Sequence, residues 1–283
     1  MAIPFEKWHG TGNDFVVIDE TTKVAVPEKK KAEFAKEVCD RHFGIGADGV
    51  LFISKSSKAD LRMRMLNPDG SEAEMCGNGI RCFAKYVHEK GLVSSKKMRV
   101  ETLAGIIEPE IVAGGLVRVK MGAPILEAKK IPMQWDSERC IDADFFVDNE
   151  VGTVKLTAVS MGNPHAVIFV DSLESVDLKR TGRVIENHYR FPKKTNVHFV
   201  KVHGKGEIEI LHWERGAGAT LACGTGTVAS AVAAFVTGRT ERLVKARVPG
   251  GILHVEIEGS SKQPTQTYML GPAVRVFSGE YSG

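Results

Sequence analysis

One stretch of the sequence occurs twice in altered form, and it decides the fold. The first copy, Asn67 to Gly79, reads NPDGSEAEMCGNG, and the second, Glu214 to Gly226, reads ERGAGATLACGTG. In both copies a polar loop leads to a cysteine that is followed by Gly-X-Gly. Glycines at such a place let the chain turn and leave backbone N–H groups exposed, which is typical of the start of a helix. We therefore expect helices to begin just after Cys76 and Cys223.

The segments that flank the two copies repeat in the same register. An alternating segment, typical of a half-buried strand, precedes each loop at 61–66 and 208–213. A helical stretch follows each cysteine and stops at Gly91 or Gly238. The two cysteines lie 147 residues apart, as do these two glycines. Because so many features share one offset, we predict a duplicated α+β domain with its join between Gly122 and Gly152.

The duplication has a consequence for chemistry. Two copies of a domain usually pack about a pseudo-twofold axis, so the two cysteines are expected to face each other across a cleft. The free N–H groups and the dipole of a helix start stabilise an anion, which lowers the pKa of a thiol there. One thiolate can then remove a proton from a carbon while the opposite thiol delivers one, which inverts the configuration. The pattern predicts an epimerase or racemase.

Composition and charge exclude several other classes. The chain has 283 residues, 38 basic and 35 acidic, with a net charge of +3. This near-balance gives no reason to expect a nucleic-acid or membrane partner. No apolar run approaches the ~20 residues that span a bilayer, and the N-terminus has no signal pattern, so we expect a cytoplasmic protein. Five cysteines, an odd number, argue against a disulfide framework.

Cofactor and metal motifs are also weak. The segment Gly44 to Gly49 fits G-x-G-x-x-G, but a helical stretch precedes it and a strand follows it, the reverse of a dinucleotide site. The segment from Gly224 to Ala229 fits the looser form but lies about ten residues after the preceding strand, too far for a tight βα turn. No C-x-x-C or Cys/His cluster has zinc spacing. We therefore expect no cofactor and no metal.

At this point the motifs resemble those of the diaminopimelate epimerase family. The resemblance includes both cysteine motifs, the opening His9 to Phe15, the block Gly44 to Gly49, and Met161 to His165, and it covers nearly the whole chain in order. It implies two pseudo-symmetric domains, each a barrel-like, mostly antiparallel sheet around a central helix, with the active site in the cleft between them. By this resemblance the domains are 1–121, joined by a returning strand at 272–283, and 122–271.

The same resemblance implies an activity and a set of residues. The activity is PLP-independent interconversion of LL- and meso-2,6-diaminopimelate, which supplies lysine and peptidoglycan synthesis, by an enzyme that forms homodimers. Cys76 and Cys223 would be the acid and base, and His165 and Glu214 would tune the pKa values of the thiols. The residues implied in substrate binding are Asn13, Asn67, Gly77, Asn78, Asn163, Asn196, Glu214, Arg215, Gly224 and Thr225.

Two departures and two alternatives remain open. Gly49 stands where some family members have glutamine, and Ala219 stands where we expect glutamate. One alternative is a two-cysteine racemase of another amino acid, such as proline, although such an enzyme would have no use for Arg215 at a distal carboxylate. The other is a redox sensor in which the two thiols form a reversible disulfide. Cys39 and Cys82 are read as structural, and Cys140, in the join, has no partner motif.

Overall fold

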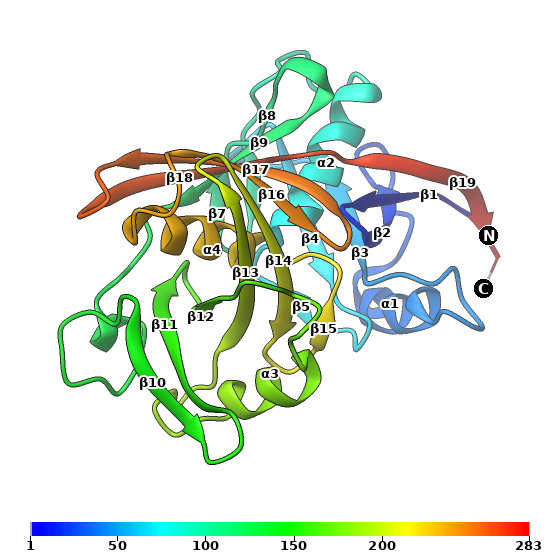
Figure 1. Cartoon of the computed structure of the whole chain (residues 1–283). Helices are drawn as coiled ribbons and strands as arrows, with labels where there is room; N and C mark the ends of the chain where they lie inside the picture. The colour runs from blue at the N-terminus through cyan, green and yellow to red at the C-terminus, as the bar shows by residue number, and fades with distance from the viewer. Residues whose placement is uncertain (1, 283) are drawn as a thin grey trace. The chain divides into compact units, whose positions relative to one another are not determined.

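The repeat in the sequence becomes a repeat of strands and helices in the computed structural model, which describes residues 2–282 (Figure 1). The chain divides into two compact units. One unit runs up to Lys120 and resumes at Leu270, and the other runs from Met121 to Met269.

The first unit contains a mixed sheet, two α-helices and a hairpin. The sheet consists of β1 (Ile3–Gly10), β2 (Asn13–Asp19), β3 (Gly49–Ser54), β4 (Leu61–Leu66), β5 (Glu72–Ala73), β6 (Val100–Thr102), β7 (Gly105–Ile107) and β19 (Val274–Tyr281). The helices are α1 (Lys31–Cys39), after a 3-10 turn at Glu28–Lys30, and α2 (Gly77–Glu89). The strand order is β19-β1-β2-β3-β4-β6-β7, with β5 beside β4. The hairpin that follows is β8 (Glu110–Ile111), a 3-10 turn at Ala113–Gly115, and β9 (Val117–Gly122).

The second unit repeats this arrangement. After a 3-10 turn at Ala128–Lys130, its strands are β10 (Ala143–Asp148), β11 (Gly152–Ser160), β12 (Pro164–Phe169), β13 (Asn196–Gly204), β14 (Glu207–Glu214), β15 (Gly218–Thr220), β16 (Leu243–Val248), β17 (Gly251–Gly259) and β18 (Pro264–Gly271). Its helices are α3 (Leu178–Glu186) and α4 (Gly224–Val236). The strand order is β10-β11-β12-β13-β14-β16-β17-β18, with β15 beside β14.

The direction of the strands repeats as well as their order. In the first unit β2 runs parallel to β3 and β4 runs parallel to β6, while the other neighbouring pairs run antiparallel. In the second unit the corresponding parallel pairs are β12 with β13 and β14 with β16. Two unrelated sheets would rarely have their parallel pairs at the same two places in the strand order. The duplication read from the sequence is therefore present in the strand pairing of both units.

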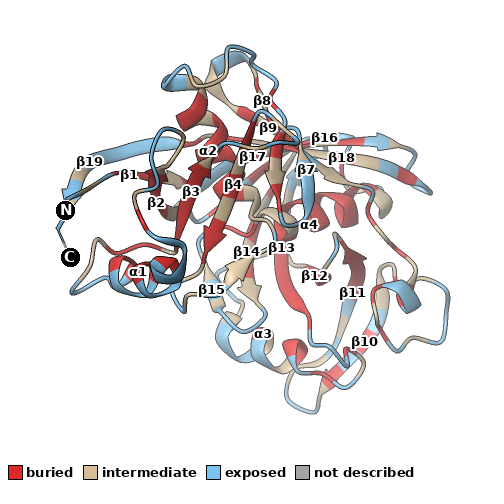
Figure 2. Cartoon of the chain, turned by 180° about the vertical axis from the view of Figure 1, so that it is seen from behind, coloured by how far each residue is buried: buried red, intermediate tan, exposed pale blue. Residues whose placement is uncertain are grey.

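The helix that follows each cysteine lies inside its unit. Every residue of α4 from Gly226 to Phe235 is buried, and α2 is buried from Asn78 to Ala84 (Figure 2). The helix α2 contacts β1 to β4 and β8, and α4 contacts β11 to β14, β16 and β17. A helix such as α4, buried on every side from Gly226 to Phe235, requires such a surrounding. The predicted α+β fold with a sheet around a central helix is confirmed, although the described strands form an open path and not a closed barrel.

Local sequence fixes both ends of these helices. Each begins at a cysteine in extended conformation that serves as the N-cap. Each ends before a glycine with positive φ, Gly91 at 65° and Gly238 at 71°. The next residue donates back to the helix, with Leu92 N–H on the Val87 carbonyl and Arg239 N–H on the Ala234 carbonyl. This is a glycine-ended C-cap, so the helix lengths are set by the sequence.

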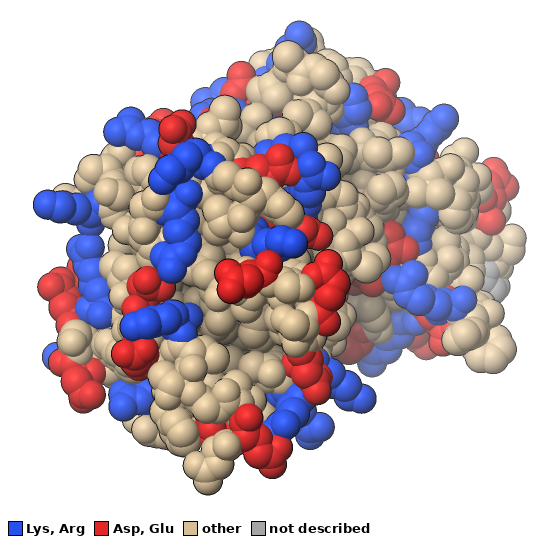
Figure 3. All heavy atoms as spheres, viewed as in Figure 1, with Lys and Arg blue, Asp and Glu red and all other residues tan. Residues whose placement is uncertain are grey.

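Charged side chains of both signs are interspersed on the face shown in Figure 3. This mixture agrees with the near-equal numbers of basic and acidic residues, 38 and 35.

The first turn of each helix offers a matched test of packing. A β carbon at Gly226 would lie 2.4 Å from Cε1 of His198, whereas one at Gly79 would meet its nearest neighbour, Cδ2 of Leu51, at 3.3 Å. Both changes to alanine gain up to about 1 kcal/mol of helix propensity. Overpacking costs about 1–3 kcal/mol. We therefore expect Gly226→Ala to unfold at a clearly lower urea concentration than Gly79→Ala, and equal midpoints would contradict the close approach of His198.

Candidate functional site

Cys76 caps the first of the two central helices. Its backbone is extended, with φ −136° and ψ 120°, and its Sγ accepts a hydrogen bond from the N–H of Gly79 at 3.4 Å. The N–H groups of Gly77 and Asn78, in the same first turn, have no acceptor within the helix. These groups and the helix dipole form a site for an anion beside the sulfur.

The amides around Cys76 form a chain with a fixed direction. The guanidinium of Arg81 donates to Oδ1 of Asn78 at 2.9 Å, Nδ2 of Asn78 donates to Oδ1 of Asn13 at 3.1 Å, and Nδ2 of Asn13 donates to a carboxylate oxygen of Asp48 at 2.7 Å. Because guanidinium only donates and carboxylate only accepts, the two amides can face only one way. The Asn13 oxygen therefore points at Cys76 Sγ, 3.7 Å away, as an acceptor for the thiol hydrogen.

Charges at both ends hold this chain in place. Arg81 is fully buried, and burial lowers the pKa of its guanidinium to about 10, so it is still charged at neutral pH. At the other end Arg41 pairs with Asp48 at 2.6 Å and with Asp14 at 2.8 Å. Burial alone would raise the pKa of Asp14, but hydrogen bonds from Arg41 and Lys7 hold it at about 2. Asp14 therefore remains ionised beside Arg41.

Cys223 caps the second central helix in the same way. Its Sγ accepts from the N–H of Gly226 at 3.3 Å and lies 3.6 Å from Oγ1 of Thr225. Burial, and next the charge of Glu214, raise the pKa of the Cys223 thiol well above its usual value. The hydrogen bonds of Thr225 and Gly226 oppose that rise. The hydrogen bonds from Thr225 and Gly226, in the first turn of α4, therefore favour the thiolate form of Cys223.

A line of histidines leads to Thr225. Asn163 donates through Nδ2 to Oγ1 of Thr225 at 3.4 Å, and its Oδ1 lies 2.9 Å from Nε2 of His165. Nδ1 of His165 lies 2.8 Å from Nε2 of His198, whose Nδ1 lies 2.9 Å from Nδ1 of His212. All three rings are fully buried. Burial lowers the pKa of His165 and of His212 to about 3, and that of His198 well below its usual value.

Four residues of the two clusters were not among the predicted site residues. Asp48 lies within the matched block Gly44 to Gly49 and Arg81 just after the first cysteine motif, but neither was given a role, and His198 and His212 have no motif signal. His198 and His212 occupy alternating positions in strands, and this placement was their only available signal.

The other predicted residues have varied surroundings. Glu214 accepts from the hydroxyl of Thr220 at 2.6 Å. The amide of Asn196 is occupied by backbone, since Oδ1 accepts from the Arg215 N–H at 3.0 Å and Nδ2 donates to the Pro164 carbonyl at 2.9 Å.

Two predicted binding residues lie outside the hydrogen-bonded clusters at the helix starts. Arg215 is exposed, and its guanidinium donates to the Lys193 carbonyl at 2.8 Å. Asn67 donates to the hydroxyl of Ser71 at 3.0 Å, within its own turn. Their roles in binding stay predictions.

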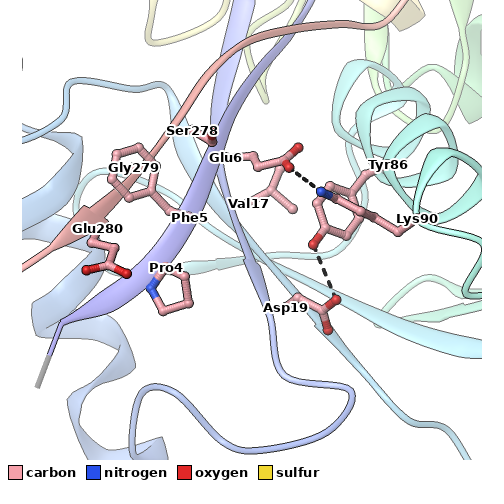
Figure 4. A pocket seen from close by; sticks show the side chains of 10 residues that line it. All are labelled: Pro4, Phe5, Glu6, Val17, Asp19, Tyr86, Lys90, Ser278, Gly279 and Glu280. Carbon is pink, nitrogen blue, oxygen red and sulfur yellow. Dashed lines mark hydrogen bonds and ion pairs between the residues drawn. The ribbon is translucent and has the colours of Figure 1, made fainter.

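A hollow of about 400 Å³ lies elsewhere in the first unit, between β1, β2, β19 and the end of α2 (Figure 4). Within it Lys90 pairs with Glu6 at 2.5 Å, and the hydroxyl of Tyr86 donates to Asp19 at 3.2 Å. These polar groups satisfy one another, and neither predicted catalytic cysteine lines the hollow.

Comparison with solved structures identifies the fold. The chain resembles a phenazine biosynthesis protein of the PhzF family from Bacillus anthracis, with a TM-score of 0.70, 18% identity and 99% of each chain covered. It also resembles a probable proline racemase from Agrobacterium radiobacter, with a TM-score of 0.68, 17% identity, and 99% of this chain and 93% of the other covered. At such identities the likeness shows the class of fold, in which two central helices are each surrounded by a sheet, and it shows no activity.

Comparison of sequences then identifies the family. The model of the diaminopimelate epimerase family matches residues 5–127 and 157–276. Proteins named diaminopimelate epimerase from Methanothermobacter thermautotrophicus and Carboxydothermus hydrogenoformans are 49% and 50% identical to the chain, with 98% of each sequence covered. The chain belongs to the diaminopimelate epimerase family and is an isomerase. The resemblance drawn from the motifs is confirmed.

None of the helices between residues 2 and 282 combines the length and the apolar character that crossing a membrane requires.

The buried histidines predict a pH dependence of stability. Their pKa values are depressed in the folded state, so below the unfolded value of 6.5 the unfolded chain binds more protons than the folded one. The free energy of unfolding should therefore fall as the pH drops from 6.5 toward 3, with a slope of at most about 1.4 kcal/mol per pH unit for each histidine.

The measurement is urea unfolding between pH 7 and pH 4.5. His212→Gln should flatten the slope, because it removes one of the depressed groups. His203→Gln, at an exposed position of β13, is the control and should keep the slope of the unmodified protein. If the free energy of unfolding depended on pH in the same way in all three proteins, the His212 ring would not be held neutral in the folded state.

Proposed function

We propose that the chain interconverts LL- and meso-2,6-diaminopimelate by removing and replacing the proton on one α-carbon, with Cys76 and Cys223 as the two proton-transfer groups and with no cofactor. One observation carries the proposal: a chain of this family has a cysteine as N-cap of each of its two corresponding central helices. In lysine and peptidoglycan precursor synthesis this reaction would supply the meso isomer.

The proton balance of the proposed reaction is simple. One cysteine begins as thiolate and takes the α-proton, and the other begins as thiol and gives its proton to the opposite face of the same carbon. After one turnover the two have exchanged protonation states, so the reverse reaction uses the same groups in opposite roles. No net proton is gained or lost by the enzyme.

The helix starts would stabilise the charge that develops in between. Removal of the α-proton moves negative charge into the α-carboxylate. Backbone N–H groups at Gly77, Asn78, Gly224 and Thr225 are donors of the kind that stabilise such a charge, and they are held by buried helices. Donors that are fixed before the reaction need no reorganisation as the charge forms.

The far end of the substrate needs partners of its own, because diaminopimelate carries an amino group and a carboxylate at both ends. We assign the distal carboxylate to Arg215, whose guanidinium can bind it with two parallel hydrogen bonds. Of the remaining predicted binding residues, Asn67, Asn163 and Glu214 offer amide and carboxylate groups for the distal and α-amino ends. Asn196, whose amide bonds backbone groups, holds the N–H of Arg215.

We also propose a homodimer in the cytoplasm. The edge strand β19 supports the dimer, because among the strands of residues 2–282 it pairs with β1 alone, and it exposes Val274, Val276 and Phe277. An exposed apolar edge strand is a ready surface for a second chain. The five cysteines are present as thiols, which suits a reducing compartment.

The first test follows solvent deuterium. The reduced protein is incubated with LL-diaminopimelate in D2O without added cofactor, and deuterium at the α-carbon and formation of the meso isomer are measured. We expect isomerisation with deuterium incorporation. Cys76→Ala and Cys223→Ala should each lose isomerisation by at least about a hundredfold, since each removes one proton-transfer group.

Cys140→Ala is the matched control, because this thiol is buried away from any helix start and should be dispensable. If the unmodified protein does not isomerise diaminopimelate, the substrate assignment is wrong. Proline and other amino acids then test for a different racemase, and reversible loss of both thiols on oxidation tests for a redox protein.

A further inference from the structure

The second unit contains an unbranched line of hydrogen bonds through three histidines to which the proposed reaction gives no part. It runs from His212 through His198 and His165 to Asn163 and Thr225, and Thr227 lies beside its far end. Sheet register produces it: His198 lies directly opposite His212 in the β13–β14 pair, and His165 lies beside Asn196 in the β12–β13 pair. The rings meet nitrogen to nitrogen in sequence. Among residues 2–282, no cluster of side chains is arranged to hold a metal ion.

The protonation of such a line is all-or-none. Each neutral imidazole carries one N–H and one bare nitrogen. Each of the two nitrogen–nitrogen contacts needs one hydrogen between its atoms. If His198 donates through Nε2 to His165, its Nδ1 is bare, so His212 must donate through Nδ1, and His165 carries its hydrogen on Nε2. The only other arrangement reverses every ring, so the two ends of the line are linked.

The end at Asn163 selects one arrangement. The Oδ1 atom of Asn163 can only accept, and it lies 2.9 Å from Nε2 of His165, so this nitrogen carries the hydrogen. At the opposite end Nε2 of His212 is then bare. It lies 3.4 Å from Oγ1 of Thr227, whose hydrogen goes to the Cys223 carbonyl at 2.8 Å, so this contact holds no hydrogen and the 2.9 Å contact at the Asn163 end decides the arrangement.

The consequence reaches the sulfur of Cys223. With its oxygen turned to His165, Asn163 presents Nδ2 to Oγ1 of Thr225 at 3.4 Å. The Thr225 oxygen then accepts, and its own hydrogen is free to donate to Cys223 Sγ at 3.6 Å. In the reversed arrangement the amide would turn over, the Thr225 hydroxyl would donate to Asn163, and the sulfur would lose this donor.

We propose that His165, His198 and His212, which we name the histidine relay, stay neutral and fix the orientation of the Asn163 amide, and so direct the Thr225 hydroxyl at the thiolate of Cys223. This inference rests on the proposed function in one respect, that Cys223 must ionise during the reaction. His198 and His212 are positioning residues, since they act through Asn163 and Thr225.

Charged groups act on the Cys223 sulfur and on the relay. Glu214, from β14, bears on Cys223 with a negative charge that opposes the thiolate. Arg215 is the positive group that bears on His165, and it disfavours a protonated ring there. A cationic relay is thus opposed by both burial and charge. The relay therefore supports the thiolate by direction of hydrogen bonding and not by its own charge.

The first test reads the relay directly in the unmodified, fully reduced protein. Nitrogen-15 NMR of the imidazole rings distinguishes a protonated ring nitrogen from a bare one. We expect hydrogens on Nε2 of His165 and His198 and on Nδ1 of His212, with every ring neutral from pH 6 to pH 9. Hydrogens in the reverse arrangement, or a ring that becomes cationic in this range, would overturn the proposal.

The second test measures the thiol itself. Alkylation of Cys223 by iodoacetamide is followed by mass spectrometry of its peptide as a function of pH, and its rate follows the fraction of thiolate. His198→Leu should slow alkylation at a fixed pH below the thiol pKa by about threefold or more, and Thr225→Val by at least as much. His203→Leu, on the same strand but exposed, should leave the profile unchanged.

Two further variants separate positioning from simple loss of structure. His198→Gln keeps one donor and one acceptor, so it should fold and restore part of the rate if His198→Leu proves unstable. Combined with Thr225→Val, His198→Leu should slow alkylation no further, because the relay acts through that hydroxyl. An unchanged profile in folded His198→Leu, or additive effects in the pair, would overturn the relay.

These measurements do not depend on turnover. A protein that fails to isomerise diaminopimelate but shows the expected ring hydrogens and the slower alkylation would retain the relay and lose the proposed substrate. The converse result, isomerisation with an unchanged alkylation profile, would retain the substrate and exclude the relay.

Discussion

The arrangement of each unit depends on one constraint, that the N-cap of its central helix is a cysteine, the side chain to which we assign proton transfer. A cap made by a hydroxyl or carboxylate stabilises a helix by about 1 kcal/mol. Here the cap is a sulfur, a weak acceptor, and it bonds the N–H of Gly79 or Gly226 at 3.4 or 3.3 Å. Such a bond cannot hold a helix start alone. Burial of α2 and α4 within their sheets supplies the rigidity that the cap lacks.

The two units share this scaffold but surround their sulfurs with different polar groups. Near Cys76, the chain from Arg81 to Asp48 has a charge at each end, so its direction is fixed, and the Asn13 oxygen can only accept. Near Cys223, the neighbour is the hydroxyl of Thr225, which can accept from a thiol or donate to a thiolate. Duplication has therefore kept the cap and changed what supports each protonation state. A reaction that needs one thiol and one thiolate is compatible with that difference.

The sequence was most informative where structure is local. The cap, the helix starts at Gly77 and Gly224, and the stops before Gly91 and Gly238 follow from residues close to one another in the chain, and each was readable as a motif. The duplicated α+β fold followed because the same local signals recur at one spacing. The parallel pairs within each sheet were not predicted, since strand direction depends on how distant segments meet. The roles of the missed histidines are likewise created by register. His198 reads as one polar residue in an apolar strand, and only the pairing that sets it opposite His212 makes a relay. A shift of one residue would turn the ring to the other face.

The two departures from the family pattern bear differently on the site. A β carbon at Gly49 would lie 2.8 Å from the carbonyl oxygen of Leu66, so any side chain there would require β3 and β4 to shift. The glycine is thus part of how this sheet is packed, and a glutamine at this position would not fit the sheet as it stands. Ala219 is exposed on β15 opposite Trp213, while Glu214 keeps its bond from Thr220. The absence of a glutamate carboxylate at position 219 therefore changes the surface of the protein, and the N-cap of α4 at Cys223 is unaffected.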